Sequence, residues 1–431
     1  MKRLRLARNA SLATTLLITA LVGLSILLGY GFSPMLSRAS EPDLKVFEQV
    51  WQTVNDSFYD PNLKGVDWRA IRRKYEPQVR QARSKPATAA VINQMLAELK
   101  TSHTYFYTSD QPAYYQILGI FRPRSSELQQ QLKPFFPNDK LEYSGIGIFT
   151  RDIDGKTFVS GVWEGSPAAE AGLRLGDQIL NAEGRPFEPI QSFAGKAGQK
   201  VKLLIQRSPD LNSQREIAVT PKLLDATTMF LDAQKASTQV IERAGKKLGY
   251  VHIWSYASDQ YQQQLEEDLF YGDLKDADAL ILDLREGWGG APLSVLNIYT
   301  ARGPSVTNIP RDRKRYTNRT QWNKPVVMLV NEGSRSAKEV LAYSFQQYKI
   351  GPVVGSKTAG AVVAGRPFLM SDGSVLYVAV ADVYVDDDQR LEGVGVTPDV
   401  EVPLPLAYAQ GADPQKERAI QVALETLQRP R

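Results

Sequence analysis

The chain has 431 residues, which is too many for a single hydrophobic core, so we expect about three domains. Apolar residues make up 43% of it and charged residues 23%, which excludes a wholly disordered protein. The absence of cysteine excludes disulfides, thiolate catalysis and zinc–cysteine sites, and a catalyst that needs imidazole must use His103 or His252.

Residues 1–39 differ in composition from the rest of the chain. Four basic residues within the first eight precede a mostly apolar run from Ala10 to Phe32, and a small-x-small site ends at Ala39. This order is typical of a secretory signal, and the run is also long enough for a membrane anchor. An internal apolar helix fits the basic flank poorly. We therefore expect an extracytoplasmic protein (periplasmic, luminal or secreted), with this segment cleaved or kept as an anchor.

The same segment accounts for the net charge. It holds five basic residues and no acidic one, which leaves 47 basic and 47 acidic residues in the remainder. A neutral remainder gives no reason to expect nucleic acid as a partner.

Residues 40–100 are predicted to form an N-terminal helical domain that packs on itself. Apolar residues recur at helical spacing in two stripes, which run from Val46 to Phe58 and from Val91 to Leu99. Tyr59–Asn62 marks a turn between them. Residues 101–140, which carry Ser102 and His103, are predicted to be a loop segment that belongs to the catalytic unit.

Residues 141–222 contain short β-rich runs separated by turns, and the stretch Gly165–Leu180 resembles the core of a PDZ domain. There G-S-P-A opens a short helix and G-L-x-x-G-D leads into a strand. The preceding loop of Gly145, Ile146, Gly147 and Ile148 resembles the carboxylate-binding loop of that domain. Its glycines allow backbone N–H groups to converge on the C-terminal carboxylate of a peptide, which adds as an edge strand. Taken alone, such glycines are more often ordinary strand residues.

Residues 223–431 alternate β and α patterns, which predicts an α/β domain with a mostly parallel sheet. Ala279–Leu284 and Val326–Val330 are continuous apolar runs of the kind found in buried parallel strands, and we expect a helix after each. Ser374–Val385 suggests an antiparallel addition to the sheet, and residues 415–428 a terminal helix.

Ser336 is the candidate nucleophile. It lies between the strand Val326–Val330 and a helical pattern, where helix-start N–H groups can stabilise an oxyanion. Ser336-x-x-Glu339 is also a capping box, and one serine can serve as both.

A glycine-rich turn follows the strand Ala279–Leu284, at the sheet edge where sites form in open α/β folds. Gly289 N–H is therefore one candidate oxyanion donor and Ala337 N–H the other; the alternative is a tight connection that needs glycine.

His103 is the candidate general base. The hydroxyl of Ser102 could fix the tautomer and orientation of its ring, as a base for serine requires. His252 lies within a strand pattern and is assigned a structural role.

Taken together, the T-S-H-T loop, the PDZ stretch, D-L-R-x-G-x-G-G and V-N-x-G-S-x-S-A-x-E resemble the carboxyl-terminal processing (tail-specific) serine peptidases. The similarity covers nearly all of the chain after residue 42. It implies a ClpP/crotonase-like α/β catalytic domain with an inserted PDZ domain. Gly355–Gly360 and Leu391–Asp399 resemble the carboxyl part of the family.

The chain departs from the Ser/Lys branch of that family, because Ala361 stands where the dyad lysine is expected and Lys338 and Lys357 lie elsewhere. The tricorn-like branch pairs a loop Ser-His with the nucleophile. The resemblance then implies Ser336 as nucleophile, His103 as general base, Ser102 as its orienting group and Glu392 as the fourth member. For Glu392 the alternative is a surface carboxylate in a turn.

The predicted activity is cleavage of polypeptides with exposed C-terminal tails by an acyl-enzyme route that needs no metal or organic cofactor. An unperturbed His103, with a pKa of about 6.5, would make activity rise through near-neutral pH. Two alternatives remain. One is an inactive relative that binds peptides or, since the fold also occurs in a retinoid-binding protein, an apolar ligand. The other is a peptidase whose base is Lys338 or Lys357. The sequence does not indicate an oligomeric state.

Overall fold

A computed structural model describes residues 41–300, 306–311, 313, 315–318 and 321–428. The signal or anchor segment predicted for residues 1–39 lies outside these ranges. Within them, no helix combines the length and the apolar character that crossing a bilayer requires.

The N-terminal part is helical, as the apolar spacing predicts. It consists of α2 (Glu41–Ser57), the turn η1 (Leu63–Gly65), α3 (Trp68–Gln81) and α4 (Lys85–Ala97). Asp67 and Ser84 cap the starts of α3 and α4 by accepting hydrogen bonds from main-chain N–H groups. These helices do not pack only on themselves, because their core also includes Leu376 and Val378 from a distant strand.

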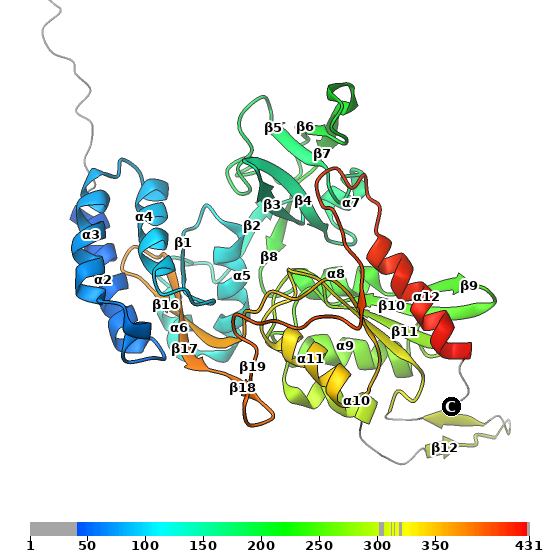
Figure 1. The fold of residues 1–431 in the computed structure, drawn as a ribbon. Coiled ribbons are helices and arrows are strands. Elements are labelled where there is room, and N and C mark those ends of the chain that lie inside the picture. Colours follow the sequence, from blue (N-terminus) through cyan, green and yellow to red (C-terminus); the bar gives the residue numbers. More distant parts are fainter. Residues whose placement is uncertain (1–40, 301–305, 312, 314, 319–320, 429–431) are drawn as a thin grey trace, which may run out of the picture.

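That strand belongs to a separate antiparallel sheet of β1 (Tyr105–Tyr107), β17 (Val375–Asp382) and β16 (Val363–Leu369), in the order β1-β17-β16. The antiparallel strand predicted within Ser374–Val385 is thus present as β17, but it joins this separate sheet and does not add to the parallel one. The sheet lies beside the N-terminal helices (Figure 1) and buries apolar residues against them. It also brings the segment after His103 next to the carboxyl part of the chain.

Residues 101–140 are not a loop throughout, contrary to the prediction. They contain β1, α5 (Pro112–Phe121), the turn η2 (Arg122–Arg124) and α6 (Ser126–Leu132). Tyr114, Ile117 and Leu118 of α5 are buried in the largest core of the molecule. The apolar run of α5 is short and begins with proline, so its periodicity is weak in the sequence.

The PDZ region lies above the α/β part in Figure 1 and begins and ends in a pair of antiparallel strands, β2 (Glu142–Gly145) and β8 (Lys222–Asp225). Between them is a sheet in the order β3-β4-β5-β6-β7. Its elements are β3 (Ile148–Ile153), β4 (Lys156–Val162), α7 (Pro167–Glu170), β5 (Gln178–Ala182), β6 (Val201–Gln206), η3 (Leu211–Ser213) and β7 (Gln214–Val219). Ser166 caps α7, as the G-S-P-A pattern predicts.

The α/β part is built on a sheet in the order β20-β15-β14-β11-β10-β9, in which β9 alone is antiparallel to its described neighbour. Its strands are β9 (Gln239–Arg243), β10 (Lys246–His252), β11 (Ala279–Asp283), β14 (Val326–Val330), β15 (Val353–Gly355) and β20 (Val400–Glu401). The accompanying helices are α8 (Met229–Ser237), α9 (Asp259–Phe270), α11 (Ala337–Gln347) and α12 (Pro414–Gln428). The helix predicted after Val326–Val330 is α11, and the predicted terminal helix is α12.

No long helix follows β11 directly, contrary to the prediction. A glycine-rich turn leads instead into η4 (Leu293–Leu296) and the single-turn α10 (Asn297–Thr300). Two small hairpins complete the described elements. They are β12 (Val306–Asn308) with β13 (Tyr316–Asn318), and β18 (Tyr384–Val385) with β19 (Gln389–Arg390).

Candidate active site

Ser336 occupies a sharp turn between β14 and α11. Its backbone has φ 59° and ψ −132°, a region that side chains rarely adopt, and holding a residue there costs on the order of 1–3 kcal/mol. The turn is held from below by Ser334, whose hydroxyl donates to Leu284 O (2.9 Å) and accepts from Asn331 N (3.0 Å). The sequence therefore places Ser336 at a strained point above the carboxyl ends of β11 and β14.

Glu339 locks this turn to the loop before β16. Its fully buried carboxylate accepts hydrogen bonds from the main-chain N–H groups of Ser336 (3.1 Å), Gly360 (2.6 Å) and Ala361 (2.8 Å), and from Thr358 Oγ1 (2.6 Å). Burial raises the pKa of Glu339, although these donors oppose the shift. The capping-box expectation is met in that Glu339 reaches back to Ser336 N–H, and the same carboxylate also fixes a second loop beside the candidate nucleophile.

Gly289 lies against the turn of Ser336. A Cβ atom at Gly289 would come within 2.6 Å of Ser336 Cβ and 2.9 Å of Ala337 N, so only glycine fits. Among the described residues, neither Gly289 N–H nor Ala337 N–H donates to any acceptor. Two N–H groups without an acceptor among the described residues thus belong to the residues that adjoin Ser336, as an oxyanion site requires.

The T-S-H-T loop meets Glu392 across a sequence separation of 290 residues. Glu392 Oε1 accepts from Ser102 N (2.8 Å), while Oε2 accepts from Ser102 Oγ (2.8 Å) and Val362 N (2.7 Å). Ser102 Oγ is also 3.0 Å from His103 Nδ1. Glu392 is buried, so it is not the surface carboxylate that the alternative envisaged.

These contacts determine the tautomer of His103. The Ser102 hydroxyl has one hydrogen and gives it to the Glu392 carboxylate, which can only accept. The contact with the ring is therefore a hydrogen bond from His103 Nδ1–H to Ser102 Oγ. Nε2 is left with a free lone pair, which is the form of imidazole that can take a proton from serine.

His103 is buried, and this changes its basicity. Burial, followed by the positive charge of Arg335, lowers the pKa of His103 to about 3. Its ring packs against that of Tyr377, with 5.4 Å between centroids. The imidazole is therefore neutral at the pH values at which most proteins work, which replaces the expectation of an unperturbed pKa.

His103 and Ser336 line the same small cavity of about 70 Å³, together with Gly289, Tyr377 and Arg335. Within the described part of the chain, no hydrogen bond joins the Ser336 hydroxyl to the imidazole. The structure thus places His103 and Ser336 in one cavity, but their side chains are not hydrogen-bonded to each other. Catalytic hydrogen bonds are often loose before substrate binds.

Neither candidate lysine lines this cavity. Lys338 is fully buried and donates to the main-chain carbonyls of Glu286 (2.8 Å) and Trp254 (3.3 Å), and burial lowers its pKa to about 7. Lys357 is exposed. Ala361 lies beside the nucleophile, because its carbonyl accepts from Ser336 N at 2.9 Å. The position where the Ser/Lys branch carries its lysine is thus adjacent to Ser336 and holds only a methyl group.

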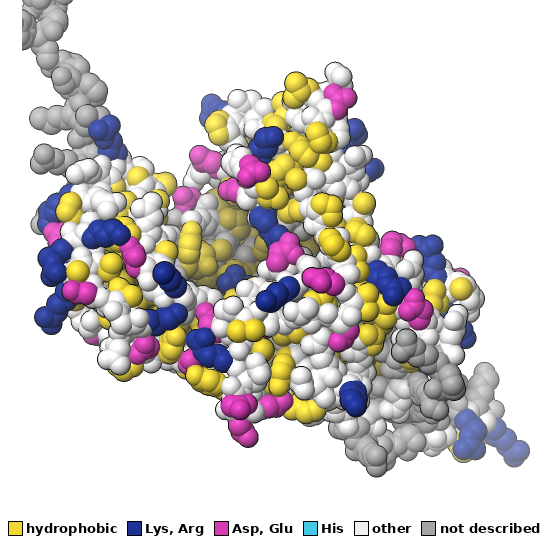
Figure 2. All heavy atoms as spheres, viewed as in Figure 1, with side chains coloured by type: hydrophobic (Ala, Val, Ile, Leu, Met, Phe, Trp, Pro, Cys, Tyr) yellow, Lys and Arg dark blue, Asp and Glu magenta, His cyan; other side chains and the backbone are white. Residues whose placement is uncertain are grey.

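A larger cavity of about 510 Å³ extends from the PDZ region to the catalytic turns. Ile148, Phe149 and Thr150 of β3 line one side, and Gly287, Trp288 and Arg335 line the other. β3 is an edge strand of its sheet, so a peptide could pair with it. Figure 2 shows the molecule hollowed between the N-terminal helices and the PDZ strands, with hydrophobic side chains around the hollow.

The four residues of the predicted carboxylate-binding loop connect the end of β2 to the start of this edge strand. Gly145 ends β2, Gly147 has φ +75°, and Ile146 is buried in the PDZ core. A Cβ atom at Gly147 would meet Ser166 Cβ at 2.5 Å, so glycine is required there. The loop adjoins the cavity through Ile148.

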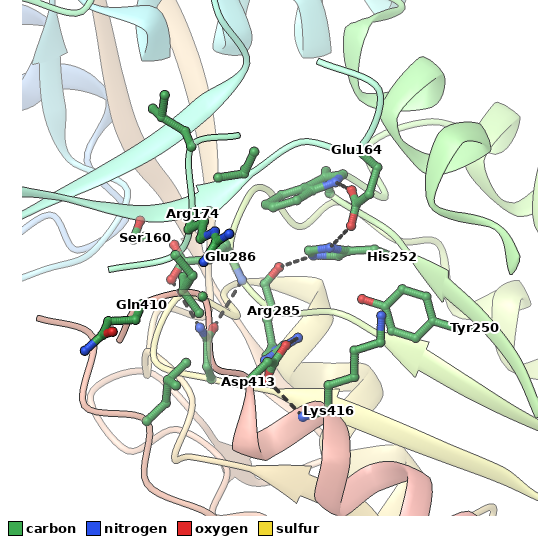
Figure 3. A pocket seen from close by; sticks show the side chains of 18 residues that line it. Ser160, Glu164, Arg174, Tyr250, His252, Arg285, Glu286, Gln410, Asp413 and Lys416 are labelled. Atoms are coloured by element: carbon green, nitrogen blue, oxygen red, sulfur yellow. Dashed lines mark hydrogen bonds and ion pairs between the residues drawn. The ribbon is translucent and has the colours of Figure 1, made fainter. Parts of the chain in front are cut away.

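His252 lies away from Ser336, in a third cavity of about 410 Å³ between the PDZ region and the α/β part. Its Nδ1 is 3.2 Å from Glu164 Oε1, and its Nε2 is 3.1 Å from Arg285 O (Figure 3). Both partners are hydrogen-bond acceptors, so these contacts favour a ring that carries hydrogen on both nitrogens. Burial lowers the pKa of His252, but the charges of Asp283 and Glu164 outweigh it and the pKa is raised.

Residues 247–402 match the peptidase family S41, residues 44–97 the Tricorn protease C1 domain, and residues 158–207 a PDZ domain. The match to peptidase family S41, together with the similarity to carboxyl-terminal processing proteases, indicates a serine-type peptidase.

Related proteins fall into two groups. The chain is 27% identical to a carboxyl-terminal-processing protease of Synechocystis sp. over 98% of its own length and 94% of that protein. It is 26% identical to tricorn protease homolog 1 of Streptomyces coelicolor over 89% of its own length and 35% of that protein. The chain therefore spans nearly all of the first protein but only about a third of the second.

Two solved structures share the fold. The tricorn protease superposes on 90% of this chain and 37% of its own, with a TM-score of 0.52 and 18% identity. Mature CPAF complexed with lactacystin covers 90% of this chain and 98% of its own, with a TM-score of 0.51 and 13% identity. At these identities the likeness concerns the fold alone.

Proposed function

We propose that the chain is a serine endopeptidase in which Ser336 is the nucleophile and His103 the general base. Ser102 and Glu392 orient the imidazole, and the N–H groups of Gly289 and Ala337 bind the oxyanion. This assignment is the Ser/His arrangement of the tricorn-like branch. The match of residues 44–97 to a Tricorn protease C1 domain and the alanine at position 361 support it.

The reaction is acyl transfer to water. His103 Nε2 takes the proton of Ser336 as Oγ attacks a peptide carbonyl, and the carbonyl oxygen gains negative charge between the two N–H groups. The imidazolium then gives its proton to the leaving amine, and the acyl-enzyme forms. Water, deprotonated by His103, attacks the ester and releases Ser336.

The observation that carries this proposal is the hydrogen-bond chain from Glu392 through Ser102 to His103 Nδ1. A general base for serine needs neutral imidazole with the proton on one nitrogen and a free lone pair on the other. Here a buried carboxylate fixes the tautomer and leaves Nε2 free in the cavity that Ser336 also lines. That arrangement supports a base rather than a packing residue.

The substrates we propose are exported polypeptides with accessible C-terminal tails. Support comes from the basic and apolar N-terminal segment and from the PDZ loop at Gly145–Ile148. The loop would hold the terminal carboxylate while the tail pairs with β3. The larger cavity then offers a route from β3 to Ser336.

The test is hydrolysis of an unstructured polypeptide by the full chain and by the variants Ser336→Ala and His103→Ala. We expect cleavage by the wild type and losses of about 10⁴-fold or more in both variants. A fluorophosphonate probe should label the wild type and not Ser336→Ala. Retention of full activity without His103 would favour a lysine base. Absence of both cleavage and labelling in the folded wild type would favour the peptide- or apolar-ligand-binding alternative.

A further inference from the structure

Arg335 immediately precedes the candidate nucleophile, and its side chain lines both the small catalytic cavity and the larger cavity that leads to β3. Its guanidinium lies 5.3 Å from the centroid of the Trp288 ring. No carboxylate of the described residues forms an ion pair with it. Arg335 is thus a half-buried cation at the junction of the two cavities, stacked on a ring but without a counter-charge.

The nearby carboxylates are already bound by another residue. Arg151 of β3 pairs with Glu286 at 2.7 Å and also with Glu332, and Asn331 donates to Glu286 at 3.1 Å. Glu286 and Glu332 line the larger cavity too. Their charges are therefore engaged by Arg151, while that of Arg335 is not engaged.

The unpaired positive charge of Arg335 acts on the pKa values of His103 and of two tyrosines near it. After burial, the charge of Arg335 is the next cause acting on the pKa of His103, of Tyr107 and of Tyr377. In each case it lowers the pKa. The guanidinium of Arg335 is therefore close enough to act on all three side chains. It also lines the cavity that Ser336 lines, where the scissile bond would lie.

We propose that Arg335 binds a carboxylate of the substrate close to the scissile bond and so gives the peptidase a preference for acidic residues or a free C-terminus there. The proposal rests on Ser336 being the nucleophile. The planar guanidinium fork matches a carboxylate with two parallel hydrogen bonds. Stacking on Trp288 holds the fork in place beforehand, so little side-chain freedom is lost on binding.

The experiment compares peptides that differ only near the cleaved bond. One set places Asp or Asn at each position within two residues of that bond. A second set presents the same sequence as a free acid or as an amide ending within those two residues. kcat/KM is measured for the wild type, Arg335→Gln and Arg335→Lys.

We expect the wild type to prefer at least one carboxylate-bearing peptide by about 10- to 100-fold, which is the range of a charged hydrogen-bonded pair. Arg335→Gln should abolish the preference, and Arg335→Lys should keep part of it. A preference for Asp identifies an acidic side chain as the ligand, and a preference for the free acid identifies the α-carboxylate. The matched control is Arg366→Gln, since Arg366 also stacks on a ring, that of Phe368 at 5.0 Å, but lies outside both cavities.

Equal cleavage of acidic and neutral peptides by the wild type would overturn this inference and leave the proposed function intact, as would a preference that survives Arg335→Gln. If cleavage persists in Ser336→Ala, the proposed function fails, and this inference fails with it. If Arg335→Gln does not fold, binding of the same peptides to Ser336→Ala decides the matter. Peptides with Asp and with Asn, all amidated at the C-terminus so that the PDZ loop is not engaged, should then differ in affinity, and equal affinities would refute the role of Arg335.

Discussion

At the scale of single residues, the site depends on which atom of His103 carries the proton. Ser102 Oγ donates its one hydrogen to Glu392 and therefore accepts the hydrogen bond from His103 Nδ1–H. In this way Glu392 orients the ring through Ser102. The residues were predictable, because each lies in a motif that resembles a peptidase family. The resemblance also implied that Ser102 orients His103 and that Glu392 completes the set, but the direction of each hydrogen bond could not be derived from residues 290 positions apart in the sequence. Arg335 was not predicted either, since an arginine in a polar turn has no distinctive pattern.

Replacing Glu392 with glutamine should reverse the direction of these hydrogen bonds. A glutamine N–H₂ group can donate to Ser102 Oγ, whose hydrogen then goes to Nδ1 and leaves the proton on Nε2. We expect kcat to fall by about 10²–10⁴-fold with little change in KM. Steady-state kinetics measure this effect, and Glu425→Gln on the exposed face of α12 is the control. An unchanged kcat would show that Glu392 does not orient the ring.

The pH profile should reflect the lowered pKa of His103. Activity rises with pH as the imidazole loses its proton, so a pKa of about 3 places this rise far below the value of 6.5 for an unperturbed histidine. We expect kcat/KM to stay nearly flat from pH 5 to 8, as recorded in brief assays of enzyme kept at neutral pH beforehand. Arg335→Gln removes one cause of the shift and should move the rise to higher pH. A wild-type midpoint near 6.5 would contradict the buried environment of the ring.

At the scale of elements, strands and helices with strong apolar patterns were predictable because burial alone selects them. β11, β14 and α11 are examples. Which strands pair with each other was not predictable. β17 pairs with β1 and β16 rather than with a strand of the parallel sheet, and this pairing depends on contacts between residues that are distant in sequence. The turn after β11 was expected to open a helix. Its glycines instead let Gly287 and Gly289 approach Trp254 and Ser336 closely.

Lys338 at the start of α11 holds this turn in place. Its amine donates to the carbonyls of Glu286 and Trp254, and Trp254 O also accepts from Trp288 N at 2.8 Å. Lys338→Met should loosen Gly289 and lower kcat by about 10- to 100-fold, with little effect on KM, because one oxyanion donor is displaced. Lys357→Met, at an exposed lysine, is the control. A complete loss as deep as that of Ser336→Ala would instead point to Lys338 as the base.

At the scale of the whole molecule, the PDZ region and the α/β part are joined by charged contacts around His252 (Figure 3). Glu164 comes from the PDZ side, and Arg285 and Asp283 come from the end of β11. The other titratable residues that line this cavity are Arg174, Tyr250, Glu286, Asp413 and Lys416. In its protonated form, His252 is therefore a charged link between two parts of the molecule.

This link should weaken as pH rises. The pKa of His252 is raised in the folded protein, so its contribution to stability is fully present below the unfolded value of about 6.5 and is lost as pH passes through the folded value. The protection of the amides of residues 163–166 from hydrogen exchange, corrected for the intrinsic rise of the exchange rate with pH, should fall over that range. Glu164→Gln should abolish this pH dependence and lower stability by about 1–3 kcal/mol. Glu170→Gln, on the exposed side of α7, should leave it unchanged. Protection that does not vary with pH in the wild type would refute the charged state.

The paired strands β2 and β8 have one more consequence. Glu142 lies opposite Asp225, so the chain leaves the catalytic unit and returns to it at neighbouring points. The segment between them can therefore be exchanged as a unit without changing the chain path to Ser336, once the contacts that Arg151 and Glu164 make with the α/β part are rebuilt. New recognition modules could therefore be grafted onto an unaltered chemical centre, whether by evolution or by protein engineering.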